Sequence, residues 1–592
     1  NALLERKGAP TALVTTAGFE DVLVIGRQPR RDLYDILITR PEPLVADNLR
    51  LGVQERTLPD GSIEKKLDSS ELTRLVGKLR STRVKSIAVS LLYSFANQTH
   101  EKRIEAALKS LGLPISLSSE ILPEYREYER TSTTTINAYL STVMSQYLER
   151  LEADLSDTPL RVMQSNGGVA KASMSMAAPV RTILSGPAGG VVGAFFVARE
   201  SGYPKIITFD MGGTSTDVAL CDGEIRVTNE SQLDGMPIGV PMMDIHTVGA
   251  GGGSIAGLDA GGALRVGPES SGADPGPVCY GKGESLTVTD ANVLLGRLLP
   301  KFFLGGSMPL TVERIPAVVD RLDWTNAWRN RQRLAQGIID VVNNNMEHAI
   351  RLISIERGHD LRDFTLVCFG GAGALHAATL AGNLGIPRVV VPPHPGALSA
   401  LGLLLADSRK DYSRTLLGMS RLTESKIRKA LSGLHRKGID ELKQEGFKRI
   451  QIKKMDFLDV RYKGQSYELT IPFSEDWNGE FHRAHKRRYG HSNSESPVEV
   501  VSARTMLVGE TPKPGIKKAS RRAHRPRPVD SVRVWFRNSW SKTRVFDRAM
   551  LRYGHVISGP AIVGEYSSTT LVPPDHRCEV DKFQNLVLTK KR

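Results

Sequence analysis

The segment 206–217, IITFDMGGTSTD, constrains the fold of this chain more than any other segment. Apolar residues lead to Asp210, glycines and hydroxyl residues follow, and Asp217 opens a second apolar run. This order predicts a strand, a tight glycine turn and a returning strand, which together make a β-hairpin with an acid ending its first strand. A purely structural hairpin is the alternative, and the coincidence of acid, glycines and hydroxyl groups in one turn weighs against it.

The turn of this hairpin has the composition of a phosphate and cation site. Gly212 and Gly213 lack Cβ, so the backbone there can approach a ligand closely. Successive N–H groups make an anion-binding concavity. Three hydroxyl side chains add donors: Thr214, Ser215 and Thr216. Mg²⁺ usually takes one or two carboxylates plus phosphate oxygens, so Asp210 or Asp217 is a candidate ligand.

A second glycine-rich loop follows the apolar run TLVCF and precedes a helical pattern. It consists of Gly370, Gly371, Ala372 and Gly373. Such a loop lets the base and ribose of a nucleotide lie against the backbone, and two loops that each follow a strand suggest one nucleotide held between them. A third loop, 249–254, either approaches phosphate or substrate or packs structurally, and the sequence leaves both interpretations open.

The length and hydropathy of the chain predict a protein of about three domains without a membrane span. The sequence has 592 residues, and no run of about 18 apolar residues occurs in it. Four cysteines without a CxxC spacing argue against a disulfide scaffold and favour the cytoplasm. We expect a division into 1–177, 178–411 and 412–592.

Much of the net charge of +15 lies in the segment Lys513–Arg544, which holds eleven Lys or Arg and one acid. Nucleic-acid binding is one interpretation of such a segment. The alternation VRVWFR instead favours a basic, proline-rich loop (520–528) that enters a strand, and a surface for an acidic partner subunit. We therefore expect no nucleic-acid partner.

A scattered set of side chains hints at a zinc site. His, Cys and carboxylate ligands suit Zn²⁺, and the middle of the chain contains Asp244, His246, Cys279 and Asp290. Their spacing follows no compact motif, so a buried hydrogen-bonded histidine and a core cysteine are the alternative.

Motifs along nearly the whole chain resemble the hydantoinase/oxoprolinase family of N-methylhydantoinase A-like, ATP-dependent subunits. The resemblance is carried by NALLERKGA, VMQSNGGVA, RTILSGPAGGVVGA, ITFDMGGTSTDVAL, MDIHTVGAGGGSIA, GPESSGADPGPVCYG, LVCFGGAGALHA and PPHPGALSALGLLLAD. It implies an α/β, two-lobe ATPase core of the actin, sugar-kinase and Hsp70 kind. A C-terminal α+β region with a small β-domain would follow this core.

The resemblance also implies an activity. It implies hydrolysis of a cyclic amide, such as a hydantoin, 5-oxoproline or a lactam, by phosphoryl transfer from Mg²⁺-ATP to the carbonyl oxygen and subsequent ring opening. Asp210 and Asp217 would be catalytic, Asp210 holding Mg²⁺, and the glycine loops would bind ATP. The chain would work in a hetero-oligomer with a second subunit of hydantoinase B type.

Two further alternatives remain open within the resemblance. The same nucleotide site serves ATPase subunits of acetone- and acetophenone-type carboxylases, and no motif marks the substrate. In the family a first acid–Gly–Gly–Thr hairpin precedes the stretch NALLERKGA, in which this sequence begins. On that ground a non-catalytic assembly subunit is also considered, although the intact segment 210–217 argues against long decay.

Overall fold

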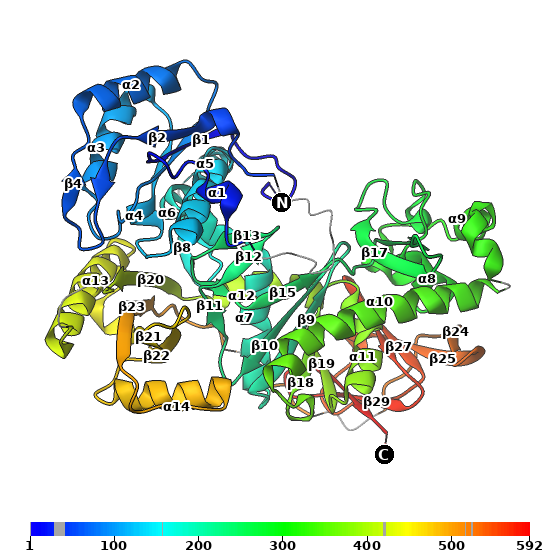
Figure 1. The fold of residues 1–592 in the computed structure, drawn as a ribbon. Helices are drawn as coiled ribbons and strands as arrows, with labels where there is room; N and C mark the ends of the chain where they lie inside the picture. Colours follow the sequence, from blue (N-terminus) through cyan, green and yellow to red (C-terminus); the bar gives the residue numbers. More distant parts are fainter. Residues whose placement is uncertain are drawn as a thin grey trace. The chain divides into compact units, whose positions relative to one another are not determined.

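The computed structural model describes residues 2–28, 42–156, 158–328, 330–417, 422–515, 517–521 and 525–591. They form two compact units, each built from three separated stretches of the chain. Unit 1 comprises Asn1–Ser185, Val227–Met242 and Asp407–Thr511, and unit 2 comprises Gly186–Arg226, Met243–Ala406 and Pro512–Arg592. Both units mix helices and sheets (Figure 1), which confirms the predicted α/β class.

Unit 1 contains a four-stranded parallel sheet in the order β2-β1-β5-β6. Its strands are β2 (Arg50–Val53), β1 (Thr11–Thr16), β5 (Ser86–Ser90) and β6 (Ile115–Leu117). In β1, Ala12 and Val14 pack with α2 (Ser69–Arg80) and α3 (Thr99–Leu108), whereas Leu13 packs with Ala138 of α5 (Glu127–Leu155). Helices therefore cover both faces, which explains why β1 and β5 are buried along their whole length.

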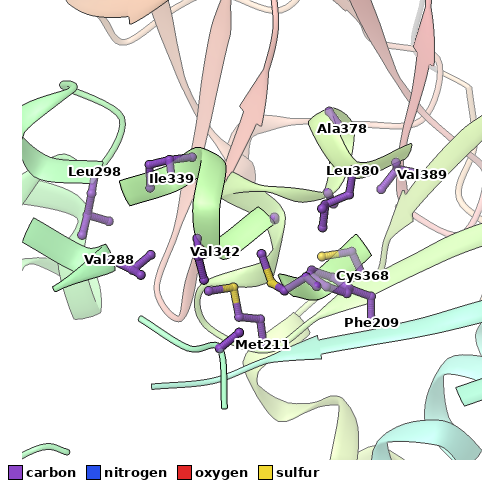
Figure 2. Packing of buried hydrophobic residues seen from close by; sticks show 14 of the residues in the cluster. Phe209, Met211, Val288, Leu298, Ile339, Val342, Cys368, Ala378, Leu380 and Val389 are labelled. Carbon is purple, nitrogen blue, oxygen red and sulfur yellow. The ribbon is translucent and has the colours of Figure 1, made fainter. Parts of the chain in front are cut away.

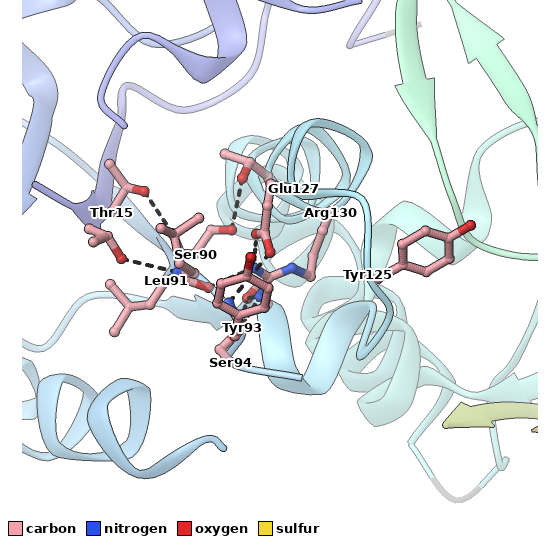
Figure 3. Close-up of polar contacts among 12 residues, drawn as sticks. Thr15, Ser90, Leu91, Tyr93, Ser94, Tyr125, Glu127 and Arg130 are labelled. Carbon is pink, nitrogen blue, oxygen red and sulfur yellow. Dashed lines mark hydrogen bonds and ion pairs between the residues drawn. The ribbon is translucent and has the colours of Figure 1, made fainter. Parts of the chain in front are cut away.

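A buried arginine ties α5 to the loop after β5 (Figure 3). Arg130 is fully buried and donates to the carbonyl oxygen of Leu91 at 2.6 Å. It also binds the hydroxyl of Ser94 and the carboxylate of Glu127. Because an unpaired buried guanidinium would be costly, these partners fix the start of α5 against the sheet.

The second sheet of unit 1 has six strands in the order β22-β21-β23-β20-β8-β7. They are β22 (Leu469–Pro472), β21 (Ile452–Tyr462), β23 (Val498–Gly509), β20 (Ser408–Thr415), β8 (Val169–Lys171) and β7 (Arg161–Met163). Helix α13 (Glu424–Gln444) packs through Ile427 and Leu431 on this sheet. Residues 161–171 and 408–509 thus share one sheet although more than two hundred residues separate them.

Unit 2 is organised around an eight-stranded sheet in the order β15-β10-β9-β18-β19-β30-β29-β26. The strands are β15 (Ile245–Val248), β10 (Thr216–Asp222), β9 (Lys205–Met211), β18 (Thr365–Phe369), β19 (Arg388–Val391), β30 (Leu586–Lys590), β29 (His576–Val580) and β26 (Val556–Ser558). The last three come from the C-terminal region. Part of the expected C-terminal β-structure therefore extends this sheet.

The core of unit 2 lies between this sheet and its helices. Phe209 and Met211 of β9 and Cys368 of β18 are buried in one cluster with Val342 of α10 (Arg331–Ile353) (Figure 2). The cluster continues to α8 (Val288–Leu294) and α11 (Ala377–Leu384). Strand β9, which contains Asp210, is thus packed firmly against the helices, and this packing fixes the position of the hairpin.

The remaining C-terminal strands form a four-stranded sheet in the order β24-β25-β27-β28. They are β24 (Asp530–Phe536), β25 (Ser539–Asp547), β27 (Ala561–Glu565) and β28 (Ser568–Val572). The strand predicted from VRVWFR is confirmed as β24, whereas the proline-rich loop predicted before it lies partly outside the described residues, at 522–524.

The cysteines agree with the expectation from composition. All four cysteines are buried and free. None of the helices within the described ranges is long and apolar enough to cross a bilayer. The predicted three-part division stays a prediction.

Candidate active site

The hairpin predicted from the sequence is confirmed. Strands β9 and β10 pair antiparallel, with Asp210 directly opposite Asp217. Residues opposite each other in an antiparallel pair project from the same face, so the two carboxylates are neighbours. The N–H of Gly212 donates to the carbonyl oxygen of Ser215 at 3.1 Å and closes the turn. Thr247 of β15 donates its hydroxyl to Asp217 at 2.5 Å.

The two carboxylates have perturbed acidities. Burial, and then the charge of Asp217, raise the pKa of Asp210 from 3.8 to about 7. Burial also raises the pKa of Asp217, against which the hydrogen bond from Thr247 acts. Within the described part of the chain no donor binds Asp210. Two adjacent, incompletely compensated carboxylates fit a hard divalent cation such as Mg²⁺, which prefers oxygen ligands.

The turn presents free backbone donors. In the described residues, the N–H groups of Gly213, Thr214 and Ser215 donate to no protein acceptor. A Cβ added at Gly212 or Gly213 would meet nothing within 4 Å, so the space above the turn is open. An anion can therefore approach these donors as closely as a phosphate requires.

The second glycine loop lies against the first. Strand β18 runs parallel to β9 with Phe369 beside Asp210, and the N–H of Ala372 donates to the carbonyl oxygen of Met211 at 3.0 Å. Gly370 has φ +79°, and a Cβ there would lie 2.4 Å from Oδ1 of Asp210. Only glycine fits this position, because both the conformation and the space exclude a side chain.

The third loop, 249–254, packs on the hairpin. The N–H groups of Gly252 and Gly253 donate to the carbonyl oxygens of Gly212 and Gly213 at 3.0 and 2.6 Å. A Cβ at Gly251 would lie 2.7 Å from the backbone of Gly213. The sequence left open whether this loop approaches a ligand or packs structurally. The structure shows that it packs against the turn and helps to fix the conformation of the turn.

A cavity of about 210 Å³ opens where these loops meet. Glycines form part of its wall: Gly212, Gly213, Gly252 and Gly371. Aromatic and hydroxyl side chains form another part: Tyr280, Phe302, Phe303, Tyr566, Ser567 and Thr569. Sequence reasoning did not find the second group, and its only signal was the hydroxyl-rich turn EYSSTT between two apolar runs. A wall that combines open glycine backbone with aromatic and hydroxyl side chains has the chemistry to contact the phosphates and the base of a nucleotide.

The predicted zinc site is wrong. Across the described residues, no three His, Cys, Asp or Glu side chains gather in a metal-binding group. Asp244 pairs with Arg357. Asp290 caps helix α8 and accepts from the N–H groups of Val278 and Cys279 at 3.1 and 2.8 Å. These contacts occupy both carboxylates. Burial also raises the pKa of the Cys279 thiol, whereas zinc requires the thiolate.

The sequence patterns of the hydantoinase/oxoprolinase family match most of the chain. The N-terminal region of that family matches residues 1–112, its main hydantoinase/oxoprolinase region matches 130–412, and its C-terminal domain matches 420–591.

Several relatives are similar over nearly the whole chain. An uncharacterized protein of Methanocaldococcus jannaschii is 39% identical over 97% of this chain and 87% of its own length. The caprolactamase subunit alpha of Pseudomonas jessenii is 36% identical over 100% of this chain and 88% of its own length. The 5-oxoprolinase 1 of Arabidopsis thaliana is 34% identical over 99% of this chain. The chain spans only 50% of that longer protein.

Two solved structures share the fold. The crystal structure of the ATP-dependent caprolactamase from Pseudomonas jessenii superimposes with a TM-score of 0.87 at 34% identity, over 100% of this chain and 90% of the other. A nucleotide-free acetone carboxylase superimposes with a TM-score of 0.83 at 26% identity, over 100% and 89%. By its sequence patterns and its relatives, this chain belongs to the hydantoinase/oxoprolinase family.

Proposed function

We propose that this chain is the ATP-dependent component of an enzyme that hydrolyses a cyclic amide. In the proposed reaction the γ-phosphoryl group of ATP is transferred to the carbonyl oxygen of the amide and ADP leaves. Two water molecules are then consumed, as the ring C–N bond breaks and phosphate is released, and the product is the ring-opened acid. The transfer converts an unreactive amide into a species with a good leaving group, which explains why ATP is needed.

One observation carries this proposal. Two facing carboxylates, Asp210 and Asp217, adjoin a turn with free N–H donors, and Gly212 and Gly213 of this turn line a cavity whose wall also contains aromatic side chains. Phosphoryl transfer needs positioning and neutralisation of the phosphate charge more than covalent chemistry by the protein. Backbone donors in a fixed turn provide both without reorganisation.

Each part of the site has a role in this proposal. The N–H groups of 213–215 and the hydroxyls of Thr214 and Ser215 bind phosphate oxygens. Thr216 donates its buried hydroxyl to the carbonyl oxygen of Ala250 and so holds the third loop in place. The loop 370–373 and the aromatic side chains of the cavity wall hold the nucleoside. Asp210, with Asp217, would hold Mg²⁺, which when bound supplies positive charge for the phosphates.

A carboxylase role is the second candidate, because the acetone carboxylase structure also superimposes over the whole chain. Higher identity to the caprolactamase favours the amide hydrolase. Because the Pseudomonas relative is named as a subunit, we also propose that this chain acts in a hetero-oligomer with a second polypeptide.

The test is stimulation of ATP hydrolysis by candidate substrates. Phosphate release should rise when caprolactam, hydantoin or 5-oxoproline is added to the protein with Mg²⁺ and ATP, and Asp210→Asn should abolish the rise. Stimulation by acetone with bicarbonate, and by none of the amides, would select the carboxylase role instead. Stimulation that persists in the Asp210→Asn variant would refute the assigned site.

A further inference from the structure

Unit 1 contains a second cavity, which the proposed function does not use. Its volume is about 500 Å³, within the range of small-molecule sites. All the residues that line it belong to unit 1, whereas the glycine loops of the candidate active site belong to unit 2. Strands β20 and β23, the segment 119–124 and the segment 227–241 supply its walls.

Part of the wall of this cavity is formed by apolar side chains. Apolar side chains from five separate stretches contribute: Phe95, Ile121, Leu122, Val240, Phe457 and Met506. An apolar wall of this size favours a ligand with a hydrocarbon body over an inorganic ion.

The charged groups of the cavity are unbalanced. Its lining contains five cationic side chains, Arg181, Arg409, Arg414, Lys437 and Arg504, and three carboxylates, Glu120, Glu124 and Asp411. The lining therefore carries a formal excess of positive charge.

The carboxylates already have partners. Glu124 accepts two hydrogen bonds from Arg504, each of 2.7 Å, and another from Ser413 at 2.6 Å. Asp411 accepts from Asn166 at 2.6 Å and lies 3.5 Å from Nε of Arg409. Glu120, the remaining carboxylate, pairs with Lys102. None of the three is left to neutralise another cation.

Two arginines of the lining have no partner among the described residues: Arg414, which is exposed, and Arg181. Arg181 is half-buried, and its guanidinium has neither a hydrogen-bond acceptor nor a carboxylate within 4.0 Å in the described ranges. Lys437 contacts the ring of Tyr412, with Nζ 5.2 Å from the ring centroid, and forms no ion pair there. A guanidinium is a planar fork that binds a carboxylate through two parallel hydrogen bonds.

We propose that this cavity binds a small organic carboxylate, with Arg181 holding the carboxylate group and the apolar wall holding the hydrocarbon body. The carboxylate supplies the acceptor that Arg181 lacks, and Lys437 adds a second positive charge at longer range. The proposal is independent of the proposed function, because it assigns a separate site in unit 1.

The test is calorimetric titration of the full chain with hexanoate, with its neutral isostere hexanamide and with hexylammonium. Hexanoate should bind, and hexanamide should bind at least about tenfold more weakly because it lacks the charge. Amide hydrogen exchange should show protection in β20 and β23 when hexanoate is present. Equal binding of hexanoate and hexanamide would overturn the proposal, as would protection at 212–216 instead or no binding of hexanoate in the millimolar range.

Variants test whether Arg181 binds the carboxylate group of hexanoate. Arg181→Gln should weaken hexanoate binding at least about tenfold, whereas Arg181→Lys, which keeps the charge, should weaken it less. Lys437→Gln, at an exposed position that does not affect folding, should also weaken binding by a smaller factor. Arg83→Gln is the matched control, since it removes one exposed charge from unit 1 outside the cavity. Equal affinities of the parent, Arg181→Gln and Lys437→Gln proteins would overturn the assignment.

Discussion

Replacing Asp210 by asparagine should stabilise unit 2 at neutral and alkaline pH in the absence of nucleotide. The pKa of Asp210 is raised from 3.8 to about 7 in the folded protein, first by burial and then by the charge of Asp217. The folded state therefore disfavours the ionised carboxylate, whereas the unfolded chain ionises it freely above its ordinary pKa. Asparagine has the same shape and no charge to bury.

The size and the pH dependence follow from this shift. A shift of about three pKa units corresponds to about 4 kcal/mol, which is an upper value for a site that is not wholly buried. Between about pH 4 and pH 7 the folded protein holds a proton that the unfolded chain has lost, so the stability of the parent falls as pH rises through this window. The cost is fully present above pH 7 and absent below about pH 4.

The assay is denaturant unfolding monitored by tryptophan fluorescence at a series of pH values. Four of the five tryptophans (324, 328, 535 and 540) lie in unit 2, so this signal reports mainly on the unit that contains the hairpin. Asp210→Asn should unfold at a higher denaturant concentration than the parent at pH 8 and at the same concentration at pH 4. Asp363→Asn, at an exposed position in the same unit, should change neither. A variant less stable than the parent at pH 8 would refute the reasoning.

Three further predictions concern the loops and the cavity around the hairpin. Gly251→Ala should abolish ATP binding, because its Cβ would lie 2.7 Å from the backbone of Gly213, whereas Gly257→Ala, with nothing within 4 Å, should bind normally in the same titration. Asp290→Ala should lower the free energy of unfolding by about 3 kcal/mol, since its N–H partners become unsatisfied, and metal analysis of the parent should find no stoichiometric zinc. Tyr566→Ala, at a position that is 69% exposed, should weaken ATP binding about tenfold without changing the thermal unfolding temperature.

The hairpin could be predicted from the sequence because all its determinants are local. Asp210 lies one residue before the end of one strand, Asp217 is the second residue of the next, and the glycines between them leave one short turn, so the pairing register follows from the spacing. The glycines at 370–373 could likewise be placed after a strand. Their contact with Asp210 was not derivable from spacing, because it depends on the parallel pairing of β18 with β9.

The rest of the site and of the fold depends on contacts that are distant in sequence. The aromatic side chains of the cavity wall include Phe302, Phe303 and Tyr566, and no periodicity links these positions. The zinc prediction failed because it considered residue types only. Residue types do not show that the carboxylate of Asp290 already accepts hydrogen bonds from two backbone N–H groups. Each unit is also assembled from three separate stretches of the chain, and no local sequence pattern indicates which stretches belong together.

The most direct test of this account is titration of the chain with Mg²⁺-ATP by calorimetry, in the parent and in Asp210→Ala. We predict that the parent binds the nucleotide and that the variant, which remains folded, binds it at least about tenfold more weakly. Equal affinities in the two proteins, or no binding by the parent, would contradict the placement of the nucleotide at the 210–217 hairpin.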